Sequence, residues 1–474
     1  MSPLWLALRL SRLPLEARAP WPSPSAVVER GRILIGDEAA EDAGVTSGIG
    51  VAAARALSPG IALFPRDEMR ENAAMRALAC WAGRLTPRVS VTADTLLLEI
   101  GACLRLFGGL EKLHAAALAG VAAQGFSAGS AASPTPLGAT WLARLRPGTH
   151  CTVIGDLGRH LDELPATVLP GDAAAALRRF GARTLGDARR LPSAALARRV
   201  GEEIPRLLER AYGERPDPRP GFVFPECFSL PLQLPGAVDN APALLFAARR
   251  LTAALAGWLA ARQAGVREAA LCLLHRRDEA RVTLRFAGPT ADGARIERVL
   301  RERLERTALA APVEALRLEA MHVETLSGGN RSLLDDAQAG HEAIDVLLER
   351  LVARLGEERV YRIAPCADYR PECATRLAQP LGKYAAGTPP PLPRPLWLLD
   401  TPEALPEVDG RPCRRGPLTL LAGPERIESG WWDGGERTGD VRRDYFVARS
   451  QDAAWLWIYR ECRAGGWFLH GYFS

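Results

Sequence analysis

Three acidic residues border apolar segments near the amino terminus and are the side chains best suited to hold a divalent cation. Glu16 follows an apolar run at residues 4–8, while Asp94 and Glu99 lie before and within another run at residues 95–100. Carboxylate oxygens are the ligands that Mg²⁺ prefers, and two-metal phosphoryl transfer needs several of them around ions about 4 Å apart. Asp94 alone would hold Mg²⁺ weakly, so this chemistry depends on what the neighbouring elements bring beside it.

The elements that must position these carboxylates alternate between strand and helix over residues 1–150. Short apolar runs predict strands at residues 4–8, 32–35, 61–65 and 95–100. Helical patterns lie between them, for example at residues 51–57 and 66–84. This alternation indicates a layered domain of sheet and helix.

Composition allows several classes of soluble protein and excludes others. The chain has 474 residues, 47% hydrophobic and 24% charged, which is ordinary for globular domains and long enough for several of them. A net charge of +5 fits an anionic partner such as DNA. The nine cysteines form no CxxC pair, so we expect reduced thiols in the cytoplasm and no zinc site. The sequence contains no run of roughly 18 apolar residues, so we expect no membrane span.

Residues 151–217 have the pattern of short helices joined by short loops. Gly181, Thr184 and Gly186 lie there in a Gly-x-x-Thr-x-Gly-Asp run. Such a run resembles helix-hairpin-helix modules, whose glycine turns let backbone N–H groups approach a DNA phosphate. A plain helical hairpin without a DNA contact is the alternative.

Residues 221–326 follow a proline-containing linker and predict an antiparallel sheet backed by helices. The expected order is strand, helix, strand, strand, helix, strand. A long amphipathic helix at residues 243–263 carries Arg249 and Arg250. A hairpin of residues 269–274 with 281–286 turns at Arg276 and Arg277. These four arginines are candidate contacts for DNA phosphates.

The rest of the chain is expected to form a connector, a spacer and a small domain. The connector is a loop and helix at residues 327–387, the spacer is polyproline at 388–395, and residues 396–474 form a β-rich domain with six of the eleven tryptophans. Its candidate partner-binding residues are Trp431, Trp432, Arg442 and Arg443. Packing of a small core, with solvated arginines, is the alternative.

The order of these segments resembles the Y-family DNA polymerases. The resemblance implies a palm and fingers at residues 1–150, a thumb at 151–217 and a little-finger α/β sandwich at 221–326. It also implies acidic metal ligands at four positions, which this chain fills with Ala7, Arg9, Asp94 and Thr95. Asp94 alone keeps a carboxylate there.

The nucleotide side departs from the family pattern as well. Residues 37–45 lie where family members use a Tyr and an Arg against the triphosphate, but they carry Glu38 and Glu41, which would repel it. Pro136 lies near the position of a phosphate-binding Lys. The resemblance therefore implies a polymerase-like protein that lacks catalysis and binds neither a metal nor a cofactor.

Further motifs resemble one group of such proteins, the ImuB family of bacterial damage-inducible mutagenesis cassettes. The motifs lie at residues 104–109, 133–137, 368–372, 423–432, 440–446 and 467–471. The resemblance implies a role in DNA repair and SOS mutagenesis. It implies a hub that binds the sliding clamp and recruits an ImuA-type protein and an error-prone DnaE-type polymerase to damaged DNA for translesion synthesis.

A clamp-binding peptide must be short, exposed and extended, with apolar anchors at its end. The family pattern is roughly Gln-x-Ser/Asp-Leu-Phe, and the matching residues are Asn330, Arg331, Ser332, Leu333 and Leu334. Asn330 in place of Gln and Leu334 in place of an aromatic should both weaken the motif. A helix cap at Ser332 is the alternative.

The sequence therefore predicts an α+β multidomain protein with an inactive Y-family body and a β-rich partner-binding domain. Two other functions stay open at this point. An active polymerase would have to use Asp94, Glu99 and Glu16 as displaced ligands. A plain DNA-binding repair factor would lack the clamp and polymerase partners.

Overall fold

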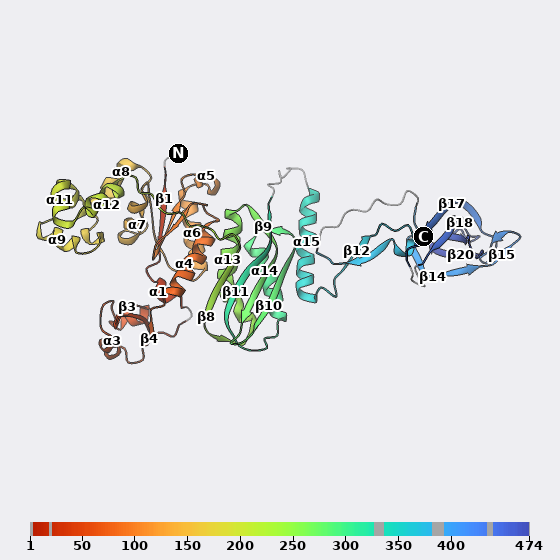
Figure 1. Cartoon of the computed structure of the whole chain (residues 1–474), viewed down its shortest axis with the longest axis horizontal. Coiled ribbons are helices and arrows are strands. Elements are labelled where there is room, and N and C mark those ends of the chain that lie inside the picture. Colours follow the sequence, from red (N-terminus) through yellow and green to blue (C-terminus); the bar gives the residue numbers. More distant parts are fainter. Residues whose placement is uncertain (1–2, 19–20, 327–335, 382–392, 434–438, 474) are drawn as a thin grey trace. The chain divides into compact units, whose positions relative to one another are not determined.

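A computed structural model describes residues 3–18, 21–326, 336–381, 393–433 and 439–473. The chain separates into two compact units, residues 1–354 and 355–474, and each is treated by itself. Figure 1 labels the elements of both units along the chain. The predicted clamp-binding residues 330–334 and most of the predicted spacer at 388–395 lie outside the described residues.

The palm is a four-stranded antiparallel sheet in the order β5-β6-β1-β7. The strands are β1 (Trp5–Arg9), β5 (Val89–Val91), β6 (Thr95–Glu99) and β7 (Gly129–Ser133). One face packs on helices α4 (Glu68–Ala82) and α6 (Leu110–Ala123), and α5 (Leu104–Phe107) precedes α6. The other face packs on α7 (Pro136–Leu145). Because both faces are covered, β1 is a continuous apolar run in the sequence.

The fingers form a small mixed sheet in the order β3-β2-β4. The elements are α1 (Leu13–Glu16), β2 (Ser25–Glu29), β3 (Arg32–Gly36), α2 (Glu38–Asp42), α3 (Val51–Leu57) and β4 (Ala62–Pro65). Strand β2 pairs antiparallel with β3 and parallel with β4. The strands predicted at residues 32–35 and 61–65 and the helix predicted at 51–57 are confirmed.

The thumb is entirely helical, as predicted. Its elements are α8 (Ile154–Asp162), η1 (Ala166–Val168), α9 (Ala173–Arg179), α10 (Leu185–Arg190), α11 (Ser193–Val200) and α12 (Glu203–Tyr212). Leu157, Leu161 and Leu185 are fully buried in a cluster that continues into α7. The thumb and the palm therefore share one apolar core.

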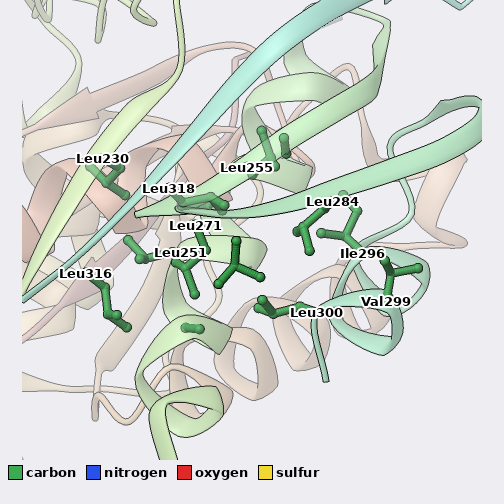
Figure 2. Close-up of a cluster of buried hydrophobic side chains, with 14 of the residues drawn as sticks. Leu230, Leu251, Leu255, Leu271, Leu284, Ile296, Val299, Leu300, Leu316 and Leu318 are labelled. Carbon is green, nitrogen blue, oxygen red and sulfur yellow. The ribbon is translucent and has the colours of Figure 1, made fainter. Parts of the chain in front are cut away.

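The little finger is a four-stranded antiparallel sheet in the order β10-β9-β11-β8. Its elements are β8 (Ser229–Val238), η2 (Ala241–Ala243), α13 (Leu244–Ala261), β9 (Ala264–Leu274), β10 (Glu279–Thr290), α14 (Gly293–Arg306) and β11 (Val313–Thr325). Figure 2 shows leucines of α13 and α14 packed against leucines of the strands. The predicted order of elements is confirmed, and so is the hairpin, since β9 pairs with β10.

Helix α13 is covered on a second side by α4. A Cβ added at Gly257 would lie 2.3 Å from the carbonyl oxygen of Cys80 and 2.4 Å from that of Trp81, so only glycine allows this close approach. Residues 241–261 form the one helix in the described part of the chain whose length and composition would suit a membrane span, with a hydropathy of 1.3. Packing on both a sheet and a helix accounts for that composition in a core helix.

Helix α15 (Asp336–Leu355) follows the little finger and crosses the boundary between the units. Its Glu349 is 1% exposed and accepts hydrogen bonds from Arg295 Nε at 2.8 Å and from the Ala287 backbone N–H at 2.7 Å. The helix predicted within the connector at residues 327–387 is confirmed and spans Asp336–Leu355.

The second unit is rich in strands. Its elements are β12 (Arg362–Pro365), η3 (Pro371–Cys373), β13 (Thr375–Ala378), β14 (Trp397–Leu405), β15 (Glu407–Val408), β16 (Arg411–Pro412), β17 (Thr419–Ser429), β18 (Val441–Arg449), β19 (Trp455–Glu461) and β20 (Trp467–Tyr472). The main sheet has the order β14-β20-β19-β18-β17. In its core Tyr445 stacks on Trp457 and its hydroxyl lies 2.8 Å from His470 Nδ1. Burial lowers the pKa of His470 to about 4, so this histidine is a neutral core residue.

Candidate functional site

The four positions predicted to replace metal ligands lie at one end of β1 and β6. Arg9 pairs with Thr95 and Ala7 pairs with Leu97 across the two strands. Directly paired residues point to the same face of a sheet, and so do residues two apart on one strand. Ala7, Arg9 and Thr95 therefore share a face, and Asp94 lies just before Thr95 at its edge.

Asp94 is held by the two residues that replace its metal-binding neighbours. Arg9 Nε donates to Asp94 Oδ2 at 2.9 Å, and the Thr95 hydroxyl donates to Asp94 Oδ1 at 2.8 Å. Both carboxylate oxygens thus have a partner from the protein. The guanidinium supplies the positive charge that a cation would otherwise bring to this carboxylate.

Ala7 lies inside an apolar cluster and offers no ligand. Its exposure is 0%, and the cluster includes Leu97, Ala131 and Trp141. A second carboxylate at this position would have to be buried among hydrocarbon side chains, which is costly without a cation or hydrogen-bond donors. The palm is therefore packed where a metal-dependent polymerase would need a polar pocket.

Glu16 and Glu99, the other candidate carboxylates, are engaged elsewhere. Glu16 is buried and accepts hydrogen bonds from the backbone N–H of Ser127 at 3.1 Å and from its hydroxyl at 2.5 Å. Glu99 lies five residues beyond Asp94 on a strand that rises about 3.4 Å per residue, so their Cα atoms are roughly 17 Å apart. Glu99 Oε1 accepts a hydrogen bond from the Gly101 N–H at 3.1 Å. The three carboxylates therefore do not gather around one ion.

The fingers present acidic groups to a palm arginine. Arg12 lies 3.1 Å from Glu41 and 3.5 Å from Glu38, which are three residues apart on α2. Both glutamates thus face the palm from one side of the helix. Their charge would oppose a triphosphate at this face.

The start of α7 is occupied by an acidic side chain that the sequence analysis missed. Pro136 is buried at the first turn, and Thr135 caps the helix through the Gly138 N–H. Asp217 Oδ2 accepts a hydrogen bond from the Leu137 N–H at 3.1 Å. A helix amino terminus attracts anions, and here the Asp217 carboxylate, which is 6% exposed, takes that place. The linker after the thumb supplies it, so the contact depends on tertiary structure.

In the predicted helix-hairpin-helix run, the three named residues differ in exposure. Gly181 is exposed, with a φ of 79°. Thr184 caps α10, and the Asp187 carboxylate accepts hydrogen bonds from the Arg183 and Thr184 N–H groups. Gly186 is buried, and a Cβ there would lie 2.9 Å from the Cβ of Asp162. Gly186 therefore serves helix packing, and the exposed turn at Gly181 is the part that could meet a phosphate.

The predicted DNA-contacting arginines of the little finger also separate into surface and core. Arg276 and Arg277 are exposed at the β9–β10 turn, and Arg249 lies 3.0 Å from Glu297 on the surface. Arg250 is 9% exposed, lies over the Phe126 ring at 4.6 Å, and has its pKa lowered by burial. The assignment of Arg250 to DNA contact was wrong, because α13 is buried on the side that faces the palm.

The sheet face opposite α13 and α14 carries ion pairs that were not predicted. Arg281 lies 3.0 Å from Glu319, and Arg285 lies 3.1 Å from Glu268. Arg317 lies 2.8 Å from both Glu279 and Glu319. Three arginines and three glutamates thus cancel in charge on this face, and phosphate contacts there would have to compete with the glutamates.

In the second unit three of the predicted partner-binding residues are exposed and the fourth is internal. Trp431 and Trp432 are 78% and 62% exposed, with ring centroids 5.4 Å apart. Arg442 is exposed. The Arg443 side chain is only 13% exposed, because it pairs with Glu372 at 2.9 Å and lies over the Tyr459 ring. Arg443 is therefore part of the fold, whereas the indoles form a surface.

A buried arginine holds the loop that carries these tryptophans. The Arg370 side chain is 3% exposed and pairs with Asp368 at 2.8 Å and with Asp433 at 3.1 Å. A Cβ at Gly430, whose φ is 92°, would lie 2.5 Å from Arg370 Nη1. Arg370 thus packs under the turn from Gly430 to Asp433 and pairs with the Asp433 carboxylate at the end of that turn.

Two solved DNA polymerases match about two thirds of the chain. A ternary complex of Dbh DNA polymerase matches with a TM-score of 0.40 and 17% identity, covering 68% of this chain and 99% of that one. DinB from Sulfolobus solfataricus matches with a TM-score of 0.38 and 15% identity, covering 67% and 98%. The palm sheet, helical thumb and helix-backed little finger themselves define the class, an α+β multidomain protein with a Y-family polymerase-like body and an added β-rich domain.

No family model matches the chain. Protein ImuB of Caulobacter vibrioides strain NA1000 / CB15N is 31% identical over 469 residues, covering 91% of this chain and 100% of that protein. Protein ImuB of strain ATCC 19089 / CIP 103742 / CB 15 matches with the same values. The chain therefore belongs to the ImuB family.

Proposed function

We propose that this chain is a non-catalytic scaffold for error-prone translesion synthesis in the cytoplasm. In this proposal it binds primer-template DNA and the sliding clamp, and it recruits an ImuA-type protein and an error-prone DnaE-type polymerase. Membership of the ImuB family supports the setting. The nine cysteines are free in the structure, which fits a reducing compartment.

The observation that carries the proposal is the pairing of Asp94 with Arg9. The Arg9 and Asp94 side chains are 26% and 45% exposed, and a pair of that exposure contributes only about 0–1 kcal/mol. Because this contribution is small, the Arg9–Asp94 pair alone would not prevent Asp94 from binding a strongly held metal ion. Mg²⁺ is disfavoured because the remaining ligand positions offer an alanine, a threonine and a like charge, so no set of carboxylates can neutralise two ions.

Replacing Asp94 with alanine tests this proposal in cells. A scaffold has no metal pair to lose, so D94A should support damage-induced mutagenesis at the wild-type level, within about twofold. An Asp94→Asn variant keeps the shape of the side chain and serves as the matched control for loss of its volume. A drop of tenfold or more in both variants, with normal protein levels, would show that the carboxylate does chemistry and would favour an active polymerase.

DNA contact is expected mainly through phosphates and outside the paired sheet face of the little finger. Arg276 and Arg277 at the exposed turn, with the turn at Gly181, are the groups we assign to it. Contacts of this kind release counterions, so affinity should fall as salt rises. They position the protein on the duplex without reading its sequence.

Replacing Leu333 and Leu334 together with alanine should abolish clamp binding. We assign residues 330–334 as the clamp peptide, and the two leucines would supply its buried anchors. Losing both side chains removes a few kcal/mol of apolar burial from a motif that is already imperfect. A titration of purified clamp against wild type and the double variant measures the effect, with Arg331→Ala as a control at a position that the motif leaves open. Equal affinities would place the clamp site in another segment.

A further inference from the structure

A cluster of two histidines and a glutamate lies on the palm, outside the ion pair that defines its former active site. Glu111 and His114 are three residues apart on α6, so they lie on one side of that helix. His150 comes from the segment after α7 and bridges to Ala132 of β7, at the edge of the palm sheet. One ligand atom from each of the three lies within 4.8 Å of the other two.

Contacts within the cluster hold the three side chains close together. The rings of His114 and His150 meet edge to face with centroids 4.4 Å apart. His150 Nδ1 lies 3.1 Å from Glu111 Oε1, and the Ser130 hydroxyl lies 2.7 Å from His114 Nε2, which fixes that ring. His150 Nε2 is buried without a hydrogen-bond partner. A buried nitrogen without a partner is unusual and calls for a ligand, an ion or a water.

From this arrangement we propose that Glu111, His114 and His150 bind a divalent transition-metal ion, of which Zn²⁺ is the best fit. Imidazole nitrogens favour Zn²⁺, Ni²⁺ or Cu²⁺ over Mg²⁺, which takes oxygen ligands. Zn²⁺ binds nitrogen at about 2.0–2.1 Å, which places tetrahedral ligand atoms ~3.3 Å apart. Glu111 Oε1 lies 3.1 Å from His150 Nδ1, close to this spacing, and the Glu111 side chain is 84% exposed, so it can adjust to an ion. Water would complete the coordination.

The donor groups of the cluster suit a divalent cation. Two adjacent imidazoles and one carboxylate offer lone pairs and a single negative charge to a dication. The ion would join α6 to the segment that returns beside β7, so it would stabilise the palm edge by binding only the folded chain.

Titration of metal-free protein with ZnCl₂ tests the site. The full-length chain, without a polyhistidine tag and stripped with a chelator, should take up one Zn²⁺ that His114→Ala or His150→Ala weakens by at least tenfold. His322→Ala removes an exposed histidine on β11 and is the matched control, with the wild-type affinity expected. Bound Co²⁺ should show no thiolate-to-metal absorption, which separates this site from the free cysteines.

A thermal shift gives a second readout that does not depend on calorimetry. Zn²⁺ should raise the melting temperature of the wild type and of H322A but not that of H150A. Glu111 lies on the surface, so Glu111→Gln should leave the fold intact and can be tested even if a histidine variant fails to fold. The Zn²⁺ affinity of this variant should also fall. Equal Zn²⁺ affinity and equal thermal shifts for the wild type, E111Q and H150A would overturn the proposal.

Discussion

Replacing Trp431 and Trp432 together with alanine is expected to abolish the binding of at least one recruited partner while leaving the second unit folded. The two indoles are exposed, contact each other and have no place in the core of the sheet. Exposed tryptophans are favoured anchors at interfaces, where each contributes about 2 kcal/mol or more. Losing both should weaken the ImuA-type protein or the DnaE-type polymerase by more than about 100-fold.

Two other exposed tryptophans of the same unit provide matched controls. Trp397 is 69% exposed on β14 and Trp455 is 49% exposed on β19, and neither lies in the turn held by Arg370. Their alanine variants should bind both partners with wild-type affinity in a pull-down or a titration. A chain that ends at Pro391 should lose the same partner as the double variant and keep DNA binding. Wild-type affinity of the double variant for both partners would exclude this surface.

Replacing Arg370 with alanine should destabilise the second unit by about 3 kcal/mol, since removing one partner of a buried ion pair leaves the other charge uncompensated. Arg370 pairs with both Asp368 and Asp433, and its side chain is 3% exposed. Arg426→Ala is the control, because Arg426 pairs with Asp444 at 2.7 Å but is 60% exposed, so its loss should cost much less than the loss of Arg370. Hydrogen exchange in the strands β17 and β18 of the full chain measures both.

The same variant has a predictable acid response. The hydrogen bond from Arg370 lowers the pKa of Asp368 in the folded chain. A carboxyl group with a lowered folded pKa stabilises the fold above its unfolded value of about 3.9, and this stability is lost as the pH falls through the folded pKa. The wild type should therefore lose more stability than R370A as the pH falls below about 3.9 and through the folded pKa of Asp368. Parallel acid unfolding curves for the two proteins would show that the pair contributes nothing.

Loss of Arg370 should also weaken partner binding, because Arg370 packs under the turn that presents Trp431 and Trp432. If R370A kept wild-type hydrogen-exchange protection in β17 and β18 and also bound its partner normally, the turn held by Arg370 would not be part of the partner surface. The Trp431/Trp432 double variant tests a direct contact with the partner, and R370A tests a residue that only supports the turn.

Much of the fold could be predicted because apolar periodicity reports burial directly. The little finger alternates clearly between strand and helix, so its order and its β9–β10 hairpin followed from the sequence. The second unit was harder: a β-rich domain was predicted at residues 396–474, but the order of the five strands in its main sheet was not. Strand β17 contains Gly423 and Pro424, residues that normally indicate a turn.

The contacts that decide the site could not be predicted, because they join residues far apart in sequence. The positive charge of Arg9 was evident, but its bond to Asp94 depends on the register of β1 against β6. Arg250 lies on an amphipathic helix whose second side meets α4, and no local pattern records that contact. His114 and His150 are separated by a strand and a helix, so no short metal-binding motif marks them.

Primer extension by the purified protein is the measurement that tests the central claim most directly. The assay should use a primed template, all four deoxynucleoside triphosphates and either Mg²⁺ or Mn²⁺, with a mock preparation to exclude contaminating polymerase. The pairing of Asp94 with Arg9 and the packing of Ala7 in an apolar core predict no incorporation above the mock under either metal. Template-dependent incorporation that exceeds the mock and disappears in D94A would contradict the account and identify this chain as an active polymerase.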